Sequence, residues 1–459
     1  MENGQLIDYF MRAMHVPNRS EYDPSTAMPQ MDGEGALPSA FPVTALAVAS
    51  IGTAAQALAD YMESRNGHRP KIRVDARLGS FWFASSLRPQ GWSQPDVRDP
   101  VTGDYATADG WIRLHANAPH HRAAVLSVIR TQAQHEALAL AISSWTSAEL
   151  ESAIVAAGGC AATMHTREQW AAHPQGRALA DEPLFHTSLH EPGPIQHDSY
   201  RPERPLAGIK VLDLTRVLAG PVSTRFLAGY GAQVLRIDPP FWTEPGMVPE
   251  VTLGKRCAML DLRLADDLQQ LKRLLVQADV LVHGYRADAL ERLGLSQAER
   301  QRIRPGLVDI CLNAYGWTGP WRLRRGFDSL VQMSNGIADA GMTYFKQNKP
   351  RPLPVQALDQ ATGYLMAGAA LRGLAIQRQS GQGSSTRFSL ARTAQLLTSG
   401  NLPEPTGLEP ETAADLSPTL EMTEWGPAQR LWPPCSIDAA PMHWDTPACS
   451  LRSSPARWP

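Results

Sequence analysis

One acidic side chain stands out as a candidate nucleophile. Asp359 lies within residues 354–363, just before an Ala-rich segment that starts at Tyr364 and has the composition of a helix. A carboxylate in a substrate pocket can attack an acyl carbon and carry the acyl group covalently. A structural role is the alternative, because an acid at a helix start is stabilised by the positive end of the helix dipole. The residue type alone leaves both roles open.

A second segment repeats the sequence frame around Asp359 without the acid. Residues 42–51 match residues 354–363 at a Pro-Val pair and an Ala-Leu pair, and Ala47 falls where Asp359 stands. Both segments continue into an Ala-rich helix, a glycine and a strand-like run. Because the frame occurs twice and the carboxylate once, we favour a chemical role for Asp359.

The elements that must position this acid belong to an alternating pattern of strands and helices. Apolar, strand-like runs separated by helical segments occur at residues 209–214, 233–237, 258–262, 280–282 and 307–312. Such alternation predicts βαβ units on a mostly parallel sheet with helices on both faces. Residues 110–115 and 160–164 are typical of short strands among helices. We therefore predict an α/β fold with a Rossmann-like, mostly parallel sheet, plus a smaller α+β domain.

The chain divides into four regions by composition. We expect an N-terminal helix and loop at 1–40, the first repeat with the smaller domain at 41–200, the Rossmann-like part at 201–400 and an irregular, Pro-rich tail at 401–459. Residues 187–206 hold several Pro, Gly and His residues and are typical of a linker. The tail has no hydrophobic period, so we expect it to lie on the surface or to be partly disordered.

Composition excludes several classes of partner. The chain has 459 residues, of which 43% are hydrophobic and 19% charged, as in ordinary globular proteins. Its formal net charge of -2 gives no general attraction to nucleic acid or anionic membranes. Five scattered cysteines without a CxxC pair argue against zinc and disulfides and fit a reducing compartment. We find no apolar run of about twenty residues and no signal-peptide pattern, so we expect a cytoplasmic protein without nucleic-acid or membrane partners.

Two further patterns are weaker. His115, His120 and His121 could suggest a metal, but adjacent histidines on a strand point in different directions. We interpret them as surface residues and expect no metal and no permanently bound cofactor. The strand that ends at Asp238 suits a dinucleotide fold, yet no GxGxxG motif accompanies it, which argues against NAD binding.

Residues 205–221, which read PLAGIKVLDLTRVLAGP, resemble the opening of the class III CoA-transferases. This CaiB/BaiF-like family includes formyl-CoA and carnitine CoA-transferases and the related alpha-methylacyl-CoA racemases. Further family-like marks follow in order at 231–238, 254–256, 261–262, 278–282, 290–295, 314–316 and 326–328, so the resemblance covers about 205–395. Residues 109–112 and 145–176 resemble the family's later half. The resemblance thus implies that the family's C-terminal part precedes its N-terminal part here. Each part alone is incomplete, so we expect them to pack as one unit, with residues 100–180 reaching the cleft near Asp359.

The resemblance implies a CoA-transferase that moves CoA between an acyl-CoA thioester and a carboxylic acid. Asp359 matches the family's nucleophile, which forms a mixed anhydride and then an aspartyl-CoA thioester. The intermediates require oxyanion donors, for which we expect backbone N–H groups. CoA is then a substrate, and the family's interlocked rings of two chains imply a homodimer.

The resemblance also implies a set of residues that line the CoA cleft or reach its phosphates. They are Val217, Leu218 and Ala219 at the carboxyl end of the first strand, Lys255 and Arg256 at the phosphates, and Tyr285, Arg292 and Tyr315 along the CoA. The chain departs from the family at Gly284-Tyr285, where Asn-Phe is usual, and at Pro239, where Arg is usual. A Gly-rich loop that shields the intermediate has no clear counterpart.

Two alternatives remain beside CoA transfer. A racemase or isomerase of the same family needs a base, and the racemases carry His where Phe327 follows Gly326. Phenylalanine cannot accept a proton, which disfavours this alternative. A non-catalytic CoA-binding relative is the other, because the CoA cleft departs from the family pattern.

Overall fold

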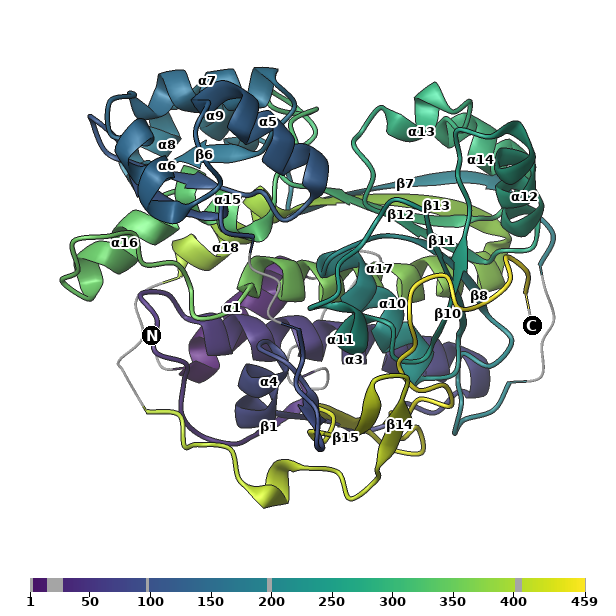
Figure 1. Cartoon of the computed structure of the whole chain (residues 1–459). Helices are drawn as coiled ribbons and strands as arrows, with labels where there is room; N and C mark the ends of the chain where they lie inside the picture. The colour runs from purple at the N-terminus through teal and green to yellow at the C-terminus, as the bar shows by residue number, and fades with distance from the viewer. Residues whose placement is uncertain (1–2, 15–27, 96–98, 196–199, 401–406, 459) are drawn as a thin grey trace.

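The computed structural model describes residues 3–14, 28–95, 99–195, 200–400 and 407–458 (Figure 1). Its largest sheet has seven strands in the order β10-β9-β8-β11-β12-β13-β7. The strands are β7 (Phe185–Pro192), β8 (Lys210–Leu214), β9 (Gln233–Asp238), β10 (Lys255–Met259), β11 (Val280–His283), β12 (Val308–Asn313) and β13 (Gln382–Ser389). All neighbours run parallel except β7, which runs antiparallel to β13. The predicted α/β fold with a mostly parallel sheet is confirmed.

The strand order identifies the sheet as Rossmann-like. Counted from β8, the parallel strands stand in the order 3-2-1-4-5-6, with the chain changing direction across the sheet between β8 and β11. The predicted linker at 187–206 is wrong in its first part, because β7 covers the free edge of β13 there. The sequence of β7 lacks an apolar run, so only its pairing with β13 identifies it as a strand.

Alternate residues of each strand face two separate cores, as a pleated strand requires. Val211, Val280 and Val308 face one core together with α10 (Ala219–Gly229) and α17 (Ala357–Ser380). The next residues, Leu212 and Leu281, face the other core with α12 (Ala265–Val276), near α13 (Ala289–Arg292) and α14 (Gln297–Ile303). The sheet therefore has helices on both faces (Figure 1).

A smaller α+β unit lies beside the carboxyl ends of the main strands (Figure 1). It contains β4 (Gly103–Ala106), β5 (Trp111–Leu114), β6 (Ala161–Thr163), α5 (Pro119–Ile129), α6 (His135–Ile142) and α7 (Ser147–Ala156), followed by α8 (Arg167–Ala172) and α9 (Pro174–Ala180). Its sheet is antiparallel and has a core of its own. Cys160 and Ala162 pack on Leu330 and Met333 of α15 (Asp328–Ser334), which α16 (Ile337–Tyr344) follows. This contact attaches the small unit to the Rossmann-like part.

A three-stranded sheet repeats one end of the main sheet. It is formed by β1 (Gln30–Asp32), β2 (Ile72–Asp75) and β16 (Cys435–Ile437), with α3 (Val43–Asn66) and α4 (Ala76–Trp82) attached. β1 runs parallel to β2 and β16 antiparallel to it, which is how β12 and β7 flank β13. The helix that follows β13 is α18 (Leu390–Ser399). The repeat seen in the sequence is thus also a repeat of sheet order and direction.

The structure corrects the register of this repeat. The helices α3 and α17 both have 24 residues, begin after Pro42 and Gln356 with nearly equal backbone angles, and end at left-handed glycines, Gly67 and Gly381. This register places Ala45, and not Ala47, opposite Asp359. The short sequence match at the Pro-Val pair hid the difference, because both residues of the second pair precede α17, whereas Val43 is already the first residue of α3.

The two long helices pack side by side (Figure 1). A Cβ atom at Gly368 would lie 3.7 Å from the Cα atom of Ala54, so small residues allow a close approach. By length and composition α3 is apolar enough to cross a membrane, although no apolar run was evident in the sequence. In this fold 94% of its most apolar stretch is buried.

The predicted irregular tail contains three short strands within residues 407–458. A short 3-10 turn, η1 (Ala413–Asp415), precedes β14 (Glu421–Thr423) and β15 (Gly426–Arg430). β14 pairs with β15, β15 pairs with β3 (Leu87–Pro89), and β16 pairs with β2. The N-terminal helix α1 (Asn3–Met14) packs on α3, as expected for a helix in 1–40, and residues 15–27 lie outside the described part. The tail's strands were missed because each has only three to five residues, and because β15 and β16 pair with β3 and β2, which lie far away in the sequence.

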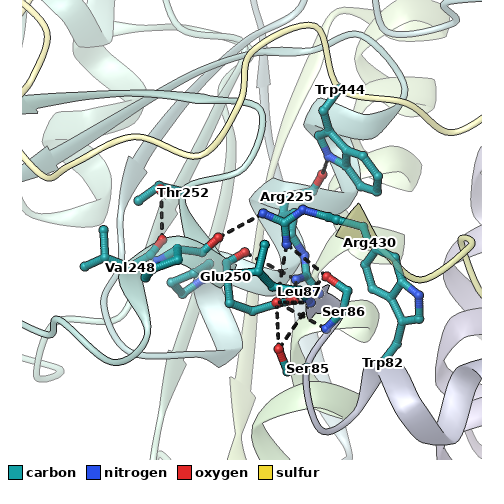
Figure 2. A network of polar contacts seen from close by, with 12 residues as sticks. Trp82, Ser85, Ser86, Leu87, Arg225, Val248, Glu250, Thr252, Arg430 and Trp444 are labelled. Carbon is teal, nitrogen blue, oxygen red and sulfur yellow. Dashed lines mark hydrogen bonds and ion pairs between the residues drawn. The ribbon is translucent and has the colours of Figure 1, made fainter. Parts of the chain in front are cut away.

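One buried carboxylate joins three regions of the chain (Figure 2). Glu250 of the short helix α11 (Val248–Val251) accepts hydrogen bonds from Ser85, Ser86 and Leu87, and it pairs with Arg225 of α10 and Arg430 of β15. Burial alone would raise the pKa of this carboxyl, but the two arginines and the hydrogen bonds lower it to about 2. The network fastens the first repeat and the tail to the Rossmann-like part.

Candidate active site

A cavity of 410 Å³ opens at the carboxyl ends of β8, β11 and β12. This is the switch point of the strand order, where open α/β sheets bind ligands. Its wall includes residues 214–220 after β8, 284–286 after β11 and 312–314 at the end of β12. Asp359, His120 and His121 also line it, so the small unit reaches the cleft. The predicted packing of the two family-like parts as one unit is confirmed by this shared cavity.

Asp359 is the third residue of α17 and is 8% exposed. Four residues later, Gly363 allows α17 to approach α10 closely, because a Cβ atom there would lie 2.4 Å from the carbonyl oxygen of Ala219. The start of α17 has no side-chain cap. Among the described residues, no hydrogen-bond donor to the Asp359 carboxylate is found, so the structural role as a helix cap has no support.

A second carboxyl group lies next to Asp359. Asp328 at the start of α15 is buried and accepts a hydrogen bond from the backbone N–H of Asp359, with an N···O distance of 2.9 Å. Burial raises the pKa of Asp328 to about 6, although the hydrogen bonds from Asp359 and Gln332 oppose this rise. Burial and the neighbouring Asp328 raise the pKa of Asp359 well above its usual range. The pair therefore retains a proton to higher pH than two exposed carboxyls would.

The predicted residues after β8 and β11 do line the cavity. Val217 has a positive φ of 64°, which is strained for a β-branched residue, and its N–H donates to Glu244 at 2.8 Å. Leu218 and Ala219 follow on the cavity wall, and Tyr285 lies on it after β11. These four predicted positions are brought together with Asp359.

The other four predicted contacts are not at the cavity. Lys255 is completely buried, and its ammonium group donates to Asp213 and to the carbonyl of Pro221, so the prediction that it binds phosphate is wrong. Arg256 is exposed at a separate hollow near the amino ends of β9 and β10. The side chain of Arg292 is 68% exposed and pairs with Asp288.

Tyr315 is the last of these predicted contacts. It is buried against Trp321 and hydrogen-bonds Ser334, so it does not border the cavity. Lys255 and Arg256 belong to the edge strand β10, which does not reach the cavity wall, so their position in the sheet explains why they are not at the cleft.

Several arginines at the cavity were not predicted. Arg216 lies between Trp242 and Tyr285, with its guanidinium carbon 4.8 Å and 5.3 Å from the two ring centres. Arg286 and Arg325 line the same cavity. Arg216 directly precedes Val217 in the family-like motif. This position next to a predicted cavity residue could have identified Arg216 from the sequence.

The interpretation of the three histidines as surface residues is wrong for His121. This side chain is 3% exposed, and His115 is half-buried with its ring stacked on Phe327 at 3.7 Å between ring centres. Pro119 begins α5, so His120 and His121 lie in a first helical turn and not on a strand. Among the described residues, no three His, Cys, Asp or Glu side chains gather as they would around a metal ion.

Comparison with known proteins identifies the family of the main segment. The model of CoA-transferase family III matches residues 206–417. This segment is therefore similar to CoA-transferase family III. Asp359, Asp328 and the cavity residues after β8 and β11 lie within it, whereas His120 and His121 lie outside.

Named relatives support the same family. The acetyl-coenzyme A transferase nodX of Hypoxylon pulicicidum is 36% identical over 189 residues, covering 40% of this chain and 32% of its own. The succinyl-CoA–D-citramalate CoA-transferase of Chloroflexus aurantiacus is 30% identical over 219 residues, covering 45% of this chain and 54% of its own. The chain thus spans about a third to a half of the length of these relatives.

Two solved structures are similar to part of the chain. Rv3272 from Mycobacterium tuberculosis is 31% identical, with a TM-score of 0.39 over 43% of this chain and 56% of its own. A CAIB/BAIF family protein from Brucella suis is 25% identical, with a TM-score of 0.39 over 49% of this chain and 65% of its own.

Proposed function

We propose that this protein is a CoA-transferase that exchanges CoA between an acyl-CoA and a carboxylic acid through covalent intermediates on Asp359. The observation that carries the proposal is the position of this carboxyl group. It lies on the wall of the switch-point cavity, within the segment that matches the model of CoA-transferase family III, and its carboxylate has no hydrogen-bond donor among the described residues. Its relatives are named as transferases of acetyl-CoA and succinyl-CoA.

The reaction would begin with ionised Asp359. Its carboxylate oxygen attacks the thioester carbonyl carbon, the C–S bond breaks, and CoA leaves as a thiolate. The thiolate then attacks the aspartyl carbonyl of the mixed anhydride and releases the first carboxylate, leaving an aspartyl-CoA thioester. An acceptor carboxylate attacks this thioester and displaces the thiolate again. The thiolate finally attacks the acyl carbonyl of the second anhydride, which frees Asp359 and forms the new acyl-CoA.

Cationic side chains at the cavity suit the phosphates of CoA. Arg216 is held between two aromatic rings, and Arg286 and Arg325 stand on the same wall. Phe241 is 56% exposed at the cavity and offers a flat surface for an adenine ring. We assign the phosphate and adenine contacts to these residues in place of Lys255, Arg256 and Arg292. Val217 to Ala219 and Tyr285 keep their proposed place along CoA.

Intact-protein mass spectrometry tests the proposal. The wild type is incubated with acetyl-CoA, succinyl-CoA and longer acyl-CoAs, and the adduct is located by peptide mapping. An acyl or CoA adduct on Asp359, absent from Asp359→Asn, is expected. Binding of CoA without any adduct would favour the non-catalytic relative. Exchange of the α-hydrogen of an acyl-CoA with solvent would favour the racemase, for which Phe327 offers no base.

Assembly and location stay predictions. The resemblance implies a homodimer, and composition implies the cytoplasm. The packing of α3 on α17 offers an intramolecular alternative, in which one chain supplies both helices. Light scattering at micromolar concentration distinguishes a monomer of 50.1 kDa from a dimer of twice that mass.

A further inference from the structure

A histidine of the small unit lies on the wall of the cavity that holds Asp359. His121 belongs to the first turn of α5, outside the segment that matches the family model. Its side chain is 3% exposed, and neither ring nitrogen has a hydrogen-bond partner among the residues that the structure describes. A buried polar ring without partners costs free energy, so this position favours a ligand that supplies one.

The contacts of His121 lead directly to the carboxyl pair. Its ring meets the ring of Phe327 edge to face, with 5.9 Å between ring centres. Phe327 directly precedes Asp328, which accepts the hydrogen bond from the backbone of Asp359. His115 stacks on the same phenyl ring and fixes its orientation. His121 therefore contacts the residue that precedes Asp328, on the wall of the cavity that Asp359 also lines.

The surroundings also set the protonation of this imidazole. Burial, and then the charges of His120 and Arg325, lower the pKa of His121 to about 4. A neutral imidazole has one N–H donor and one acceptor nitrogen. A neutral His121 therefore carries an N–H donor without a positive charge.

We infer that His121 donates a hydrogen bond to the acyl oxygen of the substrate while Asp359 attacks it; this rests on the proposed function. When the carboxylate adds to the thioester carbonyl, the carbonyl electron pair moves to oxygen and creates an oxyanion. The N–H of His121 stabilises that charge. The electron pair on the oxyanion re-forms the C=O bond as the C–S bond breaks. No proton is transferred in this step, so His121 keeps its protonation state.

Two substitutions separate this role from packing. His121→Phe keeps an aromatic ring against Phe327 but removes both nitrogens, and His121→Gln keeps an N–H donor. We expect kcat to fall about 10²-fold in His121→Phe, as for loss of one oxyanion donor. KM and the affinity for free CoA should change little. His121→Gln should recover a substantial part of the lost rate. His68→Phe is the matched control, because His68 is exposed and lies away from the cavity.

Single-turnover formation of the Asp359 adduct separates this inference from the proposed function. If the wild type forms the adduct and His121→Phe forms it at the same rate, the donor role is wrong while the proposed function stands. Equal losses in the Phe and Gln variants, with a matching drop in melting temperature, would also overturn the donor role. If the wild type forms no adduct with any acyl-CoA, the proposed function fails, and this inference fails with it.

Discussion

The unit around α17 and the unit around α3 share a frame but differ in chemistry. Each has a 24-residue helix, a left-handed glycine after it, and a central strand with one parallel and one antiparallel neighbour. In the first, Asp359 faces a cavity; in the second, Ala45 is buried at the matching place. The sheet around β13 continues through β11 to β8, whereas the sheet around β2 stops at β1.

Comparing the two units shows which elements are needed to form a core and which are needed to form a ligand cavity. The helix, its glycine and the strand build a core in both units. A ligand cavity additionally needs the switch point between β8 and β11, which the smaller sheet lacks. The spacing of the helices differs too: Gly363 allows close contact with α10, and the matching residue of α3 is Ala49. The α3 unit therefore serves as a packing partner of α17.

Asp359→Asn tests the catalytic side of the comparison and should have the largest effect. Removing the nucleophilic charge while keeping the shape should lower the transfer rate about 10⁴-fold or more. CoA binding measured by calorimetry should be nearly unchanged, because the cavity's cations remain. Transfer at the wild-type rate would move the chemistry to another residue.

Ala45→Asp, added to Asp359→Asn, is the matched control. It places a carboxyl at the corresponding position of α3, and we expect no activity to return because no cavity faces it. Burying an unpaired polar group there should also reduce the free energy of unfolding by about 1–3 kcal/mol. Restored transfer would show that the two units are chemically equivalent.

Glu250→Gln tests the attachment between the two units. It leaves the buried guanidinium groups of Arg225 and Arg430 without their anion, so the free energy of unfolding should fall by about 3–5 kcal/mol. The depressed pKa of Glu250 also predicts acid sensitivity. Its stabilisation is present above the unfolded value of 4.5 and is lost as the pH falls toward about 2. Urea unfolding from pH 7 to 3 should show a smaller pH dependence in the variant.

Alanine substitutions at the glycines that follow α3 and α17 compare the two units at matching positions. Gly67 and Gly381 both have a φ of 74°, so alanine costs about 1 kcal/mol at either site from backbone strain. A Cβ atom at Gly67 meets open space, whereas one at Gly381 would lie 2.5 Å from the carbonyl oxygen of Gly193. Gly381→Ala should therefore lower the unfolding midpoint more than Gly67→Ala does. Equal shifts would mean that the segment after β7, which contains Gly193, adapts freely.

Asp328→Asn should have the smallest effect, a shift in the pH dependence of transfer. The nucleophile must be ionised, and the neighbouring Asp328 helps to raise the pKa of Asp359. Removing that carboxyl should move the rising limb of the rate to lower pH, while an amide oxygen can still accept the backbone hydrogen bond. If the rising part of the pH–rate profile does not move, burial alone controls the ionisation of Asp359.

The sequence by itself determined the features that depend on local periodicity. Alternating apolar strands and helices specified the parallel sheet, since a strand buried on both faces must be apolar throughout. The repeated frame directed attention to Asp359, and the family-like motif located Val217 and Tyr285 beside it. Pro119 could also have revealed the first turn of α5, because proline suits that position and distinguishes a helix from a strand.

Only the tertiary structure decided which polar groups face the cavity. Lys255 is a cation next to an exposed arginine in the sequence, but its partner Asp213 comes from another strand and binds it in the core. His121 lies far from Asp359 in the chain, and the packing of the small unit on α15 brings it to the same cavity. Burial and partner choice are set by residues that lie far apart in the sequence, 42 positions for Lys255 and Asp213. Local patterns cannot specify them, because they emerge only when separate segments pack together.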